Sequence, residues 1–378
     1  MTSRKYPIGL LLLILGGVNL SCSETPKDTP NEQTEQEGLP GTVPVVGPDI
    51  QEFDGKYKLW IPVFDEGSLV FTCADFDAIV DGTADCSDLE ESGATIVGLP
   101  VTIKVFTNEA NENHLTAELE TDLDHIRGSI NQLHENGFYV LLMIDTIFYS
   151  DVDGVEQNGG GTATEDMATS DDYRKSIRDI ILDVADIAQE FQVFGISPIS
   201  EPEKTFYNVT YANEFYSEVL DSGGTILDEI RDVYSYGKLY RVEMAQAVTQ
   251  ELEPGVLPDL TGFDMFGINY SPEGSQMTVN QFTAKFDDIL DALEVLCDSN
   301  PTVDCMIDQS GVWGGAATDG LWTETDNALL AYSYGYEAVS QRSWLKGWGP
   351  FDGTDDAPFA VQNVEGAQAA IKDFFDSY

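Results

Sequence analysis

The sequence predicts a single (β/α)8 barrel, an α/β fold in which eight parallel strands close on themselves. From about residue 57 onward, short apolar runs alternate with amphipathic stretches, as expected for a parallel sheet. Eight such units fit a closed barrel better than a doubly wound sheet. No Gly-x-Gly-x-x-Gly motif follows the first strand, which argues against a dinucleotide-binding fold. The predicted strands cover residues 58–64, 101–106, 138–144, 194–197, 238–243, 263–269, 303–307 and 344–348.

The helices expected between these strands carry apolar residues at spacings of three and four. The clearest covers residues 171–191 and begins with Asp171 and Asp172, where carboxylates favour the helix dipole. The segment between the first two strands, which holds the first cysteine pair, shows no clear helix. Further helices are predicted near residues 119–133, 212–233, 282–296, 326–339 and 366–375.

The N-terminus predicts export. A basic start at residues 1–5 precedes an apolar run over residues 8–18, which is too short to span a bilayer, and then Cys22. This order resembles the signal peptide of a bacterial lipoprotein, which here covers residues 1–22 and ends at an acylated Cys22. Ordinary secretion is the alternative. The polar, proline-rich residues 23–48 predict a disordered tether, and residues 49–378 the barrel. We therefore expect an exported lipoprotein of the outer membrane or cell surface, held to the membrane by its lipid only.

The charge balance argues against negatively charged partners. The chain has 67 acidic and 18 basic residues and a net charge of −49, so nucleic acid and anionic membrane surfaces are not expected to bind it. We expect a monomer whose partner is a polysaccharide or oligosaccharide.

The cysteines predict two disulfides. With Cys22 set aside, the remaining four form two close pairs in an oxidising compartment. We predict Cys73–Cys86 and Cys297–Cys305. A zinc site is disfavoured because the chain has no Cys-x-x-Cys motif and no histidine near either pair.

The histidines limit the chemistry. All three, His114, His125 and His134, lie in or beside one predicted helix. A Ser-His-Asp hydrolase needs a histidine facing its nucleophile, and a metallohydrolase usually needs several as ligands. No phosphate-binding Gly-x-x-x-x-Gly-Lys motif is present either. Any catalysis should therefore rest on carboxylates, without a metal or other cofactor.

Carboxylates, amides and aromatic rings follow the predicted strands. Active sites of (β/α)8 barrels lie at the carboxyl ends of the strands, so these side chains should meet at one rim. Rings can stack on pyranoses, and amides and carboxylates can bind hydroxyl groups, so the mixture suits a carbohydrate. The candidates are Asp145 and Tyr149 after strand three, Glu201 and Glu203 after strand four, Asn269, Tyr270 and Glu273 after strand six, Asp308, Gln309 and Trp313 after strand seven, and Trp348 on strand eight.

One segment carries a family resemblance. Glu201-Pro202 after strand four resembles the Asn-Glu-Pro segment of the clan A glycoside hydrolases, with Ser200 in place of the asparagine. The Asp-containing end of strand three, the Phe-Gly-Ile-Asn-Tyr of strand six, the Ile-x-x-x-Gly of strand seven and the Trp-rich strand eight are similar to the β-mannanase-like branch. The resemblance implies that Glu201 is the general acid/base and that a carboxylate ending strand seven is the nucleophile. It also implies that Tyr270 contacts the nucleophile and that Trp348 forms the floor of the sugar site.

Strand seven departs from that family. Gln309 stands where the nucleophilic glutamate is expected, and an amide cannot carry the charge that attacks the anomeric carbon. Asp308 could serve after a one-residue shift of the strand end, although alternation points it to the other face. Glu273 or an aspartate of the strand-three loop could supply the charge instead. The third reading is that the site no longer catalyses.

Two functions follow from these readings. The first is a glycoside hydrolase acting on a β-linked polysaccharide, with mannan as the first guess, through paired carboxylates at the rim. The alternative is a catalytically inactive glycan-binding surface lipoprotein on the same fold. A structural envelope lipoprotein without a sugar site fits less well, because it does not account for the rim of carboxylates and rings.

Overall fold

The computed structural model describes the barrel and the segment that leads into it. The described residues are 43–50, 56–62, 69–106, 117–152, 155–158, 162–270, 278–310, 325–352 and 366–377. They belong to one compact unit that runs from Leu39 to Tyr378. The predicted signal peptide, Cys22 and most of the predicted tether lie outside the described residues, as do Glu273 and Trp313.

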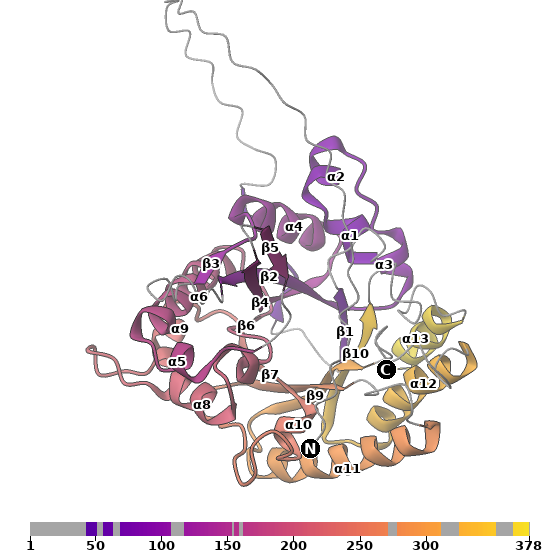
Figure 1. Cartoon of the computed structure of the whole chain (residues 1–378). Coiled ribbons are helices and arrows are strands. Elements are labelled where there is room, and N and C mark those ends of the chain that lie inside the picture. The colour runs from indigo at the N-terminus through magenta and orange to yellow at the C-terminus, as the bar shows by residue number, and fades with distance from the viewer. Residues whose placement is uncertain are drawn as a thin grey trace, which may run out of the picture. The chain divides into compact units, whose positions relative to one another are not determined.

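The predicted (β/α)8 barrel is confirmed. Eight parallel strands pair in a ring, which closes because the first strand pairs with both the second and the last. The helices lie around this ring, as Figure 1 shows. The barrel strands are β1 (Tyr57–Pro62), β2 (Ile96–Phe106), β4 (Tyr139–Val152), β6 (Gly195–Ser197), β7 (Lys238–Met244), β8 (Met265–Tyr270), β9 (Asp304–Ser310) and β10 (Leu345–Asp352).

Among the barrel strands, β2 and β4 extend furthest beyond their predicted ranges. β2 and β4 pair in parallel from Ile96 with Tyr139 up to Phe106 with Tyr149. Short antiparallel strands extend this pair at its far end, β3 (Ala117–Leu119) on β2 and β5 (Val155–Asn158) on β4. Leu119, expected in a helix, therefore lies in β3.

The long helices lie close to their predicted ranges: α4 (Leu123–Glu135), α6 (Asp171–Glu190), α11 (Val279–Asp298), α12 (Thr325–Gln341) and α13 (Ala367–Asp376). None of the helices in the described ranges is long and apolar enough to cross a membrane.

The single helix predicted over residues 212–233 is wrong. The chain forms α8 (Val209–Ser217) and α9 (Ile226–Val233) instead. Gly223 between them has φ of 89°, a left-handed conformation that helices do not continue through. Thr225 then caps α9 in a reciprocal capping box with Asp228.

The segment around the first cysteine pair is helical rather than a loop. It contains α1 (Leu69–Ala74), α2 (Phe76–Asp81) and α3 (Ser87–Glu91). Asp75 starts α2 by accepting a hydrogen bond from Ala78 N. Helices this short have little amphipathic pattern, which is why the sequence did not reveal them. The remaining short helices are α5 (Glu165–Ala168), α7 (Pro202–Thr205) and α10 (Ala245–Val248).

Both predicted disulfides are formed. Cys73–Cys86 joins α1 to the start of α3, and Cys297–Cys305 joins the end of α11 to β9. The second bond fixes the strand that carries Asp308 and Gln309 to its neighbouring helix.

Apolar side chains fill the barrel interior. This layer occupies the space within the strands, and the active sites of such barrels lie above it, at the carboxyl ends. The inward residues are Tyr57, Leu59, Ile96, Leu141, Met143, Phe194, Tyr240, Val242, Met265 and Met306.

Residues 43–50 lie against the opposite face of the barrel. Val45 N donates to Asn131 Oδ1 (2.7 Å), and Asn131 Nδ2 donates to Val43 O (2.9 Å), near the end of α4. Tyr139 OH, at the start of β4, donates to Asp49 O (3.1 Å). The chain therefore makes contact with the barrel from Val43 onward, on the face away from the carboxyl ends of the strands.

Candidate active site

Glu201 lies where β6 opens onto the rim. Its backbone N–H donates to Val242 O of β7 (3.0 Å), and the preceding Ser200 forms a parallel bridge to the same residue. Glu201 has φ of 51° and ψ of 58°, a left-handed conformation that is uncommon outside glycine. Pro202 then starts α7. Such strain costs roughly 1–3 kcal/mol and persists at functional sites where the surroundings hold it.

Two donors approach the Glu201 carboxylate, whose side chain is 17% exposed. Asn269 Nδ2, from the end of β8, donates to Oε1 (3.0 Å), and Lys204 Nζ, from α7, forms an ion pair with Oε2. Burial opposes the charge of Lys204, but the carboxylates of Glu201, Glu203 and Asp145 outweigh it and raise the pKa of the lysine. Lys204 was not among the sequence candidates, and its spacing from Glu201 was the only available signal.

The end of β9 contains a bulge. Ile307 pairs with Ile268 of β8, but Gln309 pairs with the very next residue, Asn269, so β9 has one extra residue at Asp308. Gln309 is half-buried beside Asn269. This irregularity lies at the strand end where a one-residue shift was considered from the sequence. Asp308 follows the interior residue Met306 by two positions, so alternation itself places Asp308 on the inner face, contrary to the expectation from the sequence.

Asp308 is enclosed rather than open to a ligand. It is 1% exposed, and Tyr240 OH donates to its Oδ1 (2.5 Å). Glycine at position 267 leaves space for the Asp308 side chain, since a Cβ on residue 267 would lie 2.9 Å from the Asp308 Cβ. Burial raises the pKa of Asp308 to about 8; the carboxylates of Glu201 and Asp145 also raise it, and the Tyr240 hydrogen bond opposes them. Asp308 is therefore mainly neutral at pH 7.

This assignment predicts a pH-dependent stability. A folded-state pKa above that of an unfolded aspartate stabilises the fold fully only at low pH, and the contribution is lost as the pH rises from about 4 through about 8. Between about pH 5 and about pH 9, wild type should therefore lose at least about 1.4 kcal/mol relative to Asp308→Asn. Urea unfolding of both proteins across this range measures the difference. Parallel stability curves would show that Asp308 is not held neutral.

Asp145 is the accessible counterpart. It lies on β4, opposite Thr102 of β2. Asp145 is exposed to solvent, although many protein atoms lie around its carboxyl group. This partial desolvation, together with the charge of Glu201, raises the pKa of Asp145 to about 7, while Lys204 opposes the shift. Glu201 and Asp145 thus form an electrostatically coupled pair at the barrel mouth, and both are accessible.

Three predicted sugar contacts lie away from this pair. Tyr270 stacks on Phe282 and Phe286 of α11, with ring centroids 5.3 and 5.0 Å away. Trp348 is fully buried outside the barrel and donates to Ser310 Oγ (2.5 Å). Tyr149 lies on the extension of β4, under Lys104 Nζ (4.4 Å). Tyr270 and Trp348 therefore have packing roles, and Asn269 is the predicted contact that reaches Glu201.

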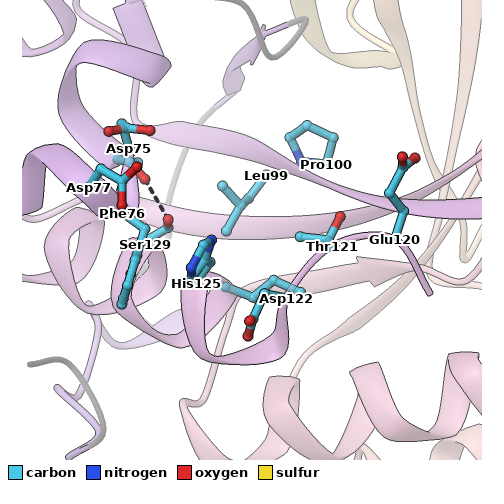
Figure 2. Close-up of a pocket in the computed structure, with 12 residues that line it drawn as sticks. Asp75, Phe76, Asp77, Leu99, Pro100, Glu120, Thr121, Asp122, His125 and Ser129 are labelled. Carbon is cyan, nitrogen blue, oxygen red and sulfur yellow. Dashed lines mark hydrogen bonds between the residues drawn. The ribbon is translucent and has the colours of Figure 1, made fainter. Parts of the chain in front are cut away.

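A separate cavity of about 350 Å³ opens on the outer wall, between α2, β2 and α4. Figure 2 shows Phe76 and His125 on one side of it and Leu99 and Pro100 on another. The Phe76 and His125 rings stack at 4.1 Å. None of the rim carboxylates lines this cavity, so it is distinct from the candidate active site. Within the described ranges, no three His, Cys, Asp or Glu side chains gather in a way that could hold a metal ion.

Comparisons with known proteins show the same fold. No protein-family model and no curated protein sequence matches the chain. A solved GH113 β-1,4-mannanase has a TM-score of 0.59 at 14% identity, covering 86% of this chain and 100% of the mannanase. The GH113 β-mannanase AaManA from Alicyclobacillus acidocaldarius, in complex with ManMIm, has a TM-score of 0.59 at 12% identity, covering 86% and 98%. The Ruminococcus gnavus β-glucuronidase has a TM-score of 0.51 at 12% identity, covering 77% of this chain and 46% of that enzyme. The chain thus has a (β/α)8 fold that resembles those of glycoside hydrolases.

Proposed function

We propose that this chain is a glycoside hydrolase that cleaves a β-linked polysaccharide at the carboxyl-end rim of its barrel. The observation that carries the proposal is the accessible, electrostatically coupled pair Glu201 and Asp145. Mannan is the first candidate substrate, because the solved structures with the higher TM-scores above are β-mannanases.

The two carboxyl groups fit different roles. Glycoside hydrolysis needs one protonated carboxyl to assist the leaving group and one charged carboxylate at the anomeric carbon. Asp145, with a pKa of about 7, can donate the proton. Glu201, paired with Lys204, supplies the negative charge. This proposal gives Glu201 a different role from the acid/base role that the clan A resemblance implies. The amides of Asn269 and Gln309, side by side across β8 and β9, are placed to bind sugar hydroxyl groups.

Reducing-sugar release from mannans, glucans, xylans and galactans tests the proposal. Release from at least one polymer supports hydrolysis, and a clear preference identifies the substrate. No release from any of them, under conditions where the protein remains folded, would reject it.

A second function is favoured by one observation. Gln309 occupies the expected nucleophile position, and Asp308 is buried and mainly neutral, so the described carboxyl end of β9, residues 308–310, offers no accessible carboxylate. A site with an amide at the nucleophile position, and without an accessible carboxylate there, suits a protein that binds glycans without cleaving them. It would be retarded in affinity gels containing one of the polymers and would release no sugar from it.

We also propose that the chain is an exported, monomeric lipoprotein of the outer membrane or cell surface. Its support is the N-terminal sequence, together with two disulfides of the kind that persist in oxidising compartments. In a bacterial host, Cys22→Ala should move the protein from the membrane fraction to the soluble exported fraction. Equal membrane association of both proteins would contradict lipid anchoring through Cys22.

A further inference from the structure

A buried polar cluster lies behind Glu201, outside the barrel wall. It consists of Glu203 from α7, Arg241 and Glu243 from β7, and Tyr216 from α8. Glu203 is 2% exposed, and Arg241 and Glu243 are fully buried. No ligand in the barrel mouth could reach these groups, and the proposed reaction does not use them. Burying two carboxyl groups is costly unless they have partners, so the cluster requires an explanation.

Arg241 compensates one of the two carboxyl groups. Its Nε donates to Glu243 Oε1 (2.6 Å), and its Nη1 donates to Asp259 O (2.8 Å). The guanidinium also lies 5.4 Å from the centre of the Tyr216 ring. One buried cation therefore balances one buried carboxylate, and Glu203 remains without a charge partner of its own inside the cluster.

The second carboxyl group of the cluster has no cation of its own and needs a proton instead. Glu203 Oε1 accepts a hydrogen bond from Met244 N (2.8 Å), whereas Glu203 Oε2 and Glu243 Oε2 are both buried and find no donor among the described residues. Glu203 and Glu243 are close enough to hydrogen-bond to each other, which requires a proton on one of them. Burial, then the charge of Glu243, raises the pKa of Glu203 well above its usual value, so Glu203 is the protonated partner.

We propose that this proton-sharing pair, Glu203 with Glu243, holds the segment that presents Glu201, and that Glu203 is a positioning residue for the active site. The segment is bound to β7 at two neighbouring points: Glu201 N to Val242 O (3.0 Å) and Glu203 Oε1 to Met244 N (2.8 Å). Between these points Glu201 keeps its left-handed conformation, which would relax if either attachment were lost. The inference rests on the proposed role of Glu201.

The pair makes the attachment sensitive to pH. The groups that face Glu203 are Glu243 and Arg241 of β7, Tyr216 of α8, and Glu201 and Lys204 of its own segment, where Lys204 forms an ion pair with Glu201. When the shared proton leaves at high pH, two carboxylates face a single arginine, and their repulsion separates α7 from β7. At lower pH the neutral Glu203 keeps the two elements together.

Glu203→Gln and Glu203→Ala test the proposal. Glutamine keeps the shape of a protonated glutamate and a permanent donor toward Glu243, so kcat should stay within about threefold of wild type near pH 6. At alkaline pH, the ratio of Glu203→Gln activity to wild-type activity should rise. Alanine leaves Met244 N and Glu243 without their partner, so kcat should fall by about tenfold or more with little change in KM. A folded Glu203→Ala protein with wild-type kcat would overturn the positioning role.

Thermal unfolding tests the shared proton without any assay of activity. Because the folded pKa of Glu203 is raised, its contribution to stability is complete below about pH 4.5 and is lost as the pH rises through the folded pKa. Wild type should therefore lose Tm relative to Glu203→Gln as the pH rises. Identical pH dependence of the two proteins would overturn the pair. If wild type hydrolyses no polymer but this difference in unfolding is present, the proposed function fails while the Glu203–Glu243 pair stands.

Discussion

Glu201→Gln is expected to lower kcat by about 10³-fold or more on whichever polymer the wild type hydrolyses. The substitution removes the negative charge that forms the ion pair with Lys204, and it leaves Lys204 and Asn269 without the carboxylate that they contact. Groups that act directly in glycoside cleavage typically contribute effects of this size. Initial rates of reducing-sugar release measure kcat, and affinity gels with the same polymer should show that binding persists.

Glu214→Gln is a matched control for this substitution. Glu214 lies exposed on α8, so the same change of charge there should leave kcat within about twofold. If Glu201→Gln retains wild-type kcat, Glu201 is not the reacting carboxylate and the proposed mechanism fails. If both variants lose activity equally, the loss reflects net charge rather than the site.

The barrel could be predicted because its strands are buried on both faces. In β4, Leu141, Leu142, Met143 and Ile144 are all buried, two facing the barrel interior and two facing the helices. A strand in that position must be continuously apolar, and such runs stand out against amphipathic helices. The disulfides could be predicted for a similar reason, since each pair is close in sequence.

The direction in which each side chain at the rim points was harder to predict from the sequence. Asn269 and Tyr270 are adjacent, yet one contacts Glu201 and the other stacks on α11. Strict alternation also assigns Asp308 and Gln309 to opposite faces, and Asp308 faces inward at the bulge in β9. A bulge depends on hydrogen bonds to both neighbouring strands, which lie far apart in sequence from the bulged residue.

The pKa shifts of the site residues could not be predicted from the sequence either. Asp145 was one of several aspartates after strand three, and nothing in the local sequence distinguished it. Burial and the charge of Glu201 raise the pKa of Asp145, and Lys204 opposes the rise; Glu201 and Lys204 both follow a different strand, β6. The Glu203–Glu243 pair likewise joins α7 to β7. Such couplings follow from the closed barrel, which brings the ends of separate strands to one place.

Asp145→Asn should have the second large effect and should change the pH profile. If Asp145 donates the proton, wild-type kcat/KM must fall as the pH rises through about 7, because only the protonated form, present below that pKa, is competent. Asparagine cannot donate, so kcat should fall by about 10²–10⁴-fold and the alkaline limb near pH 7 should disappear. Initial rates between about pH 5 and about pH 9 on the preferred polymer measure both effects.

An aryl glycoside with an acidic phenol as leaving group distinguishes proton donation from a structural defect. Such a leaving group departs without a proton, so Asp145→Asn should recover most of the wild-type rate on it, whereas Glu201→Gln should not. Asp186→Asn, an exposed position on α6, is the control for the loss of one carboxylate. If Asp145→Asn keeps the wild-type pH profile on the polymer, Asp145 is not the acid. If it is equally slow on the polymer and the activated substrate, its role is structural, and the proton must come from another group.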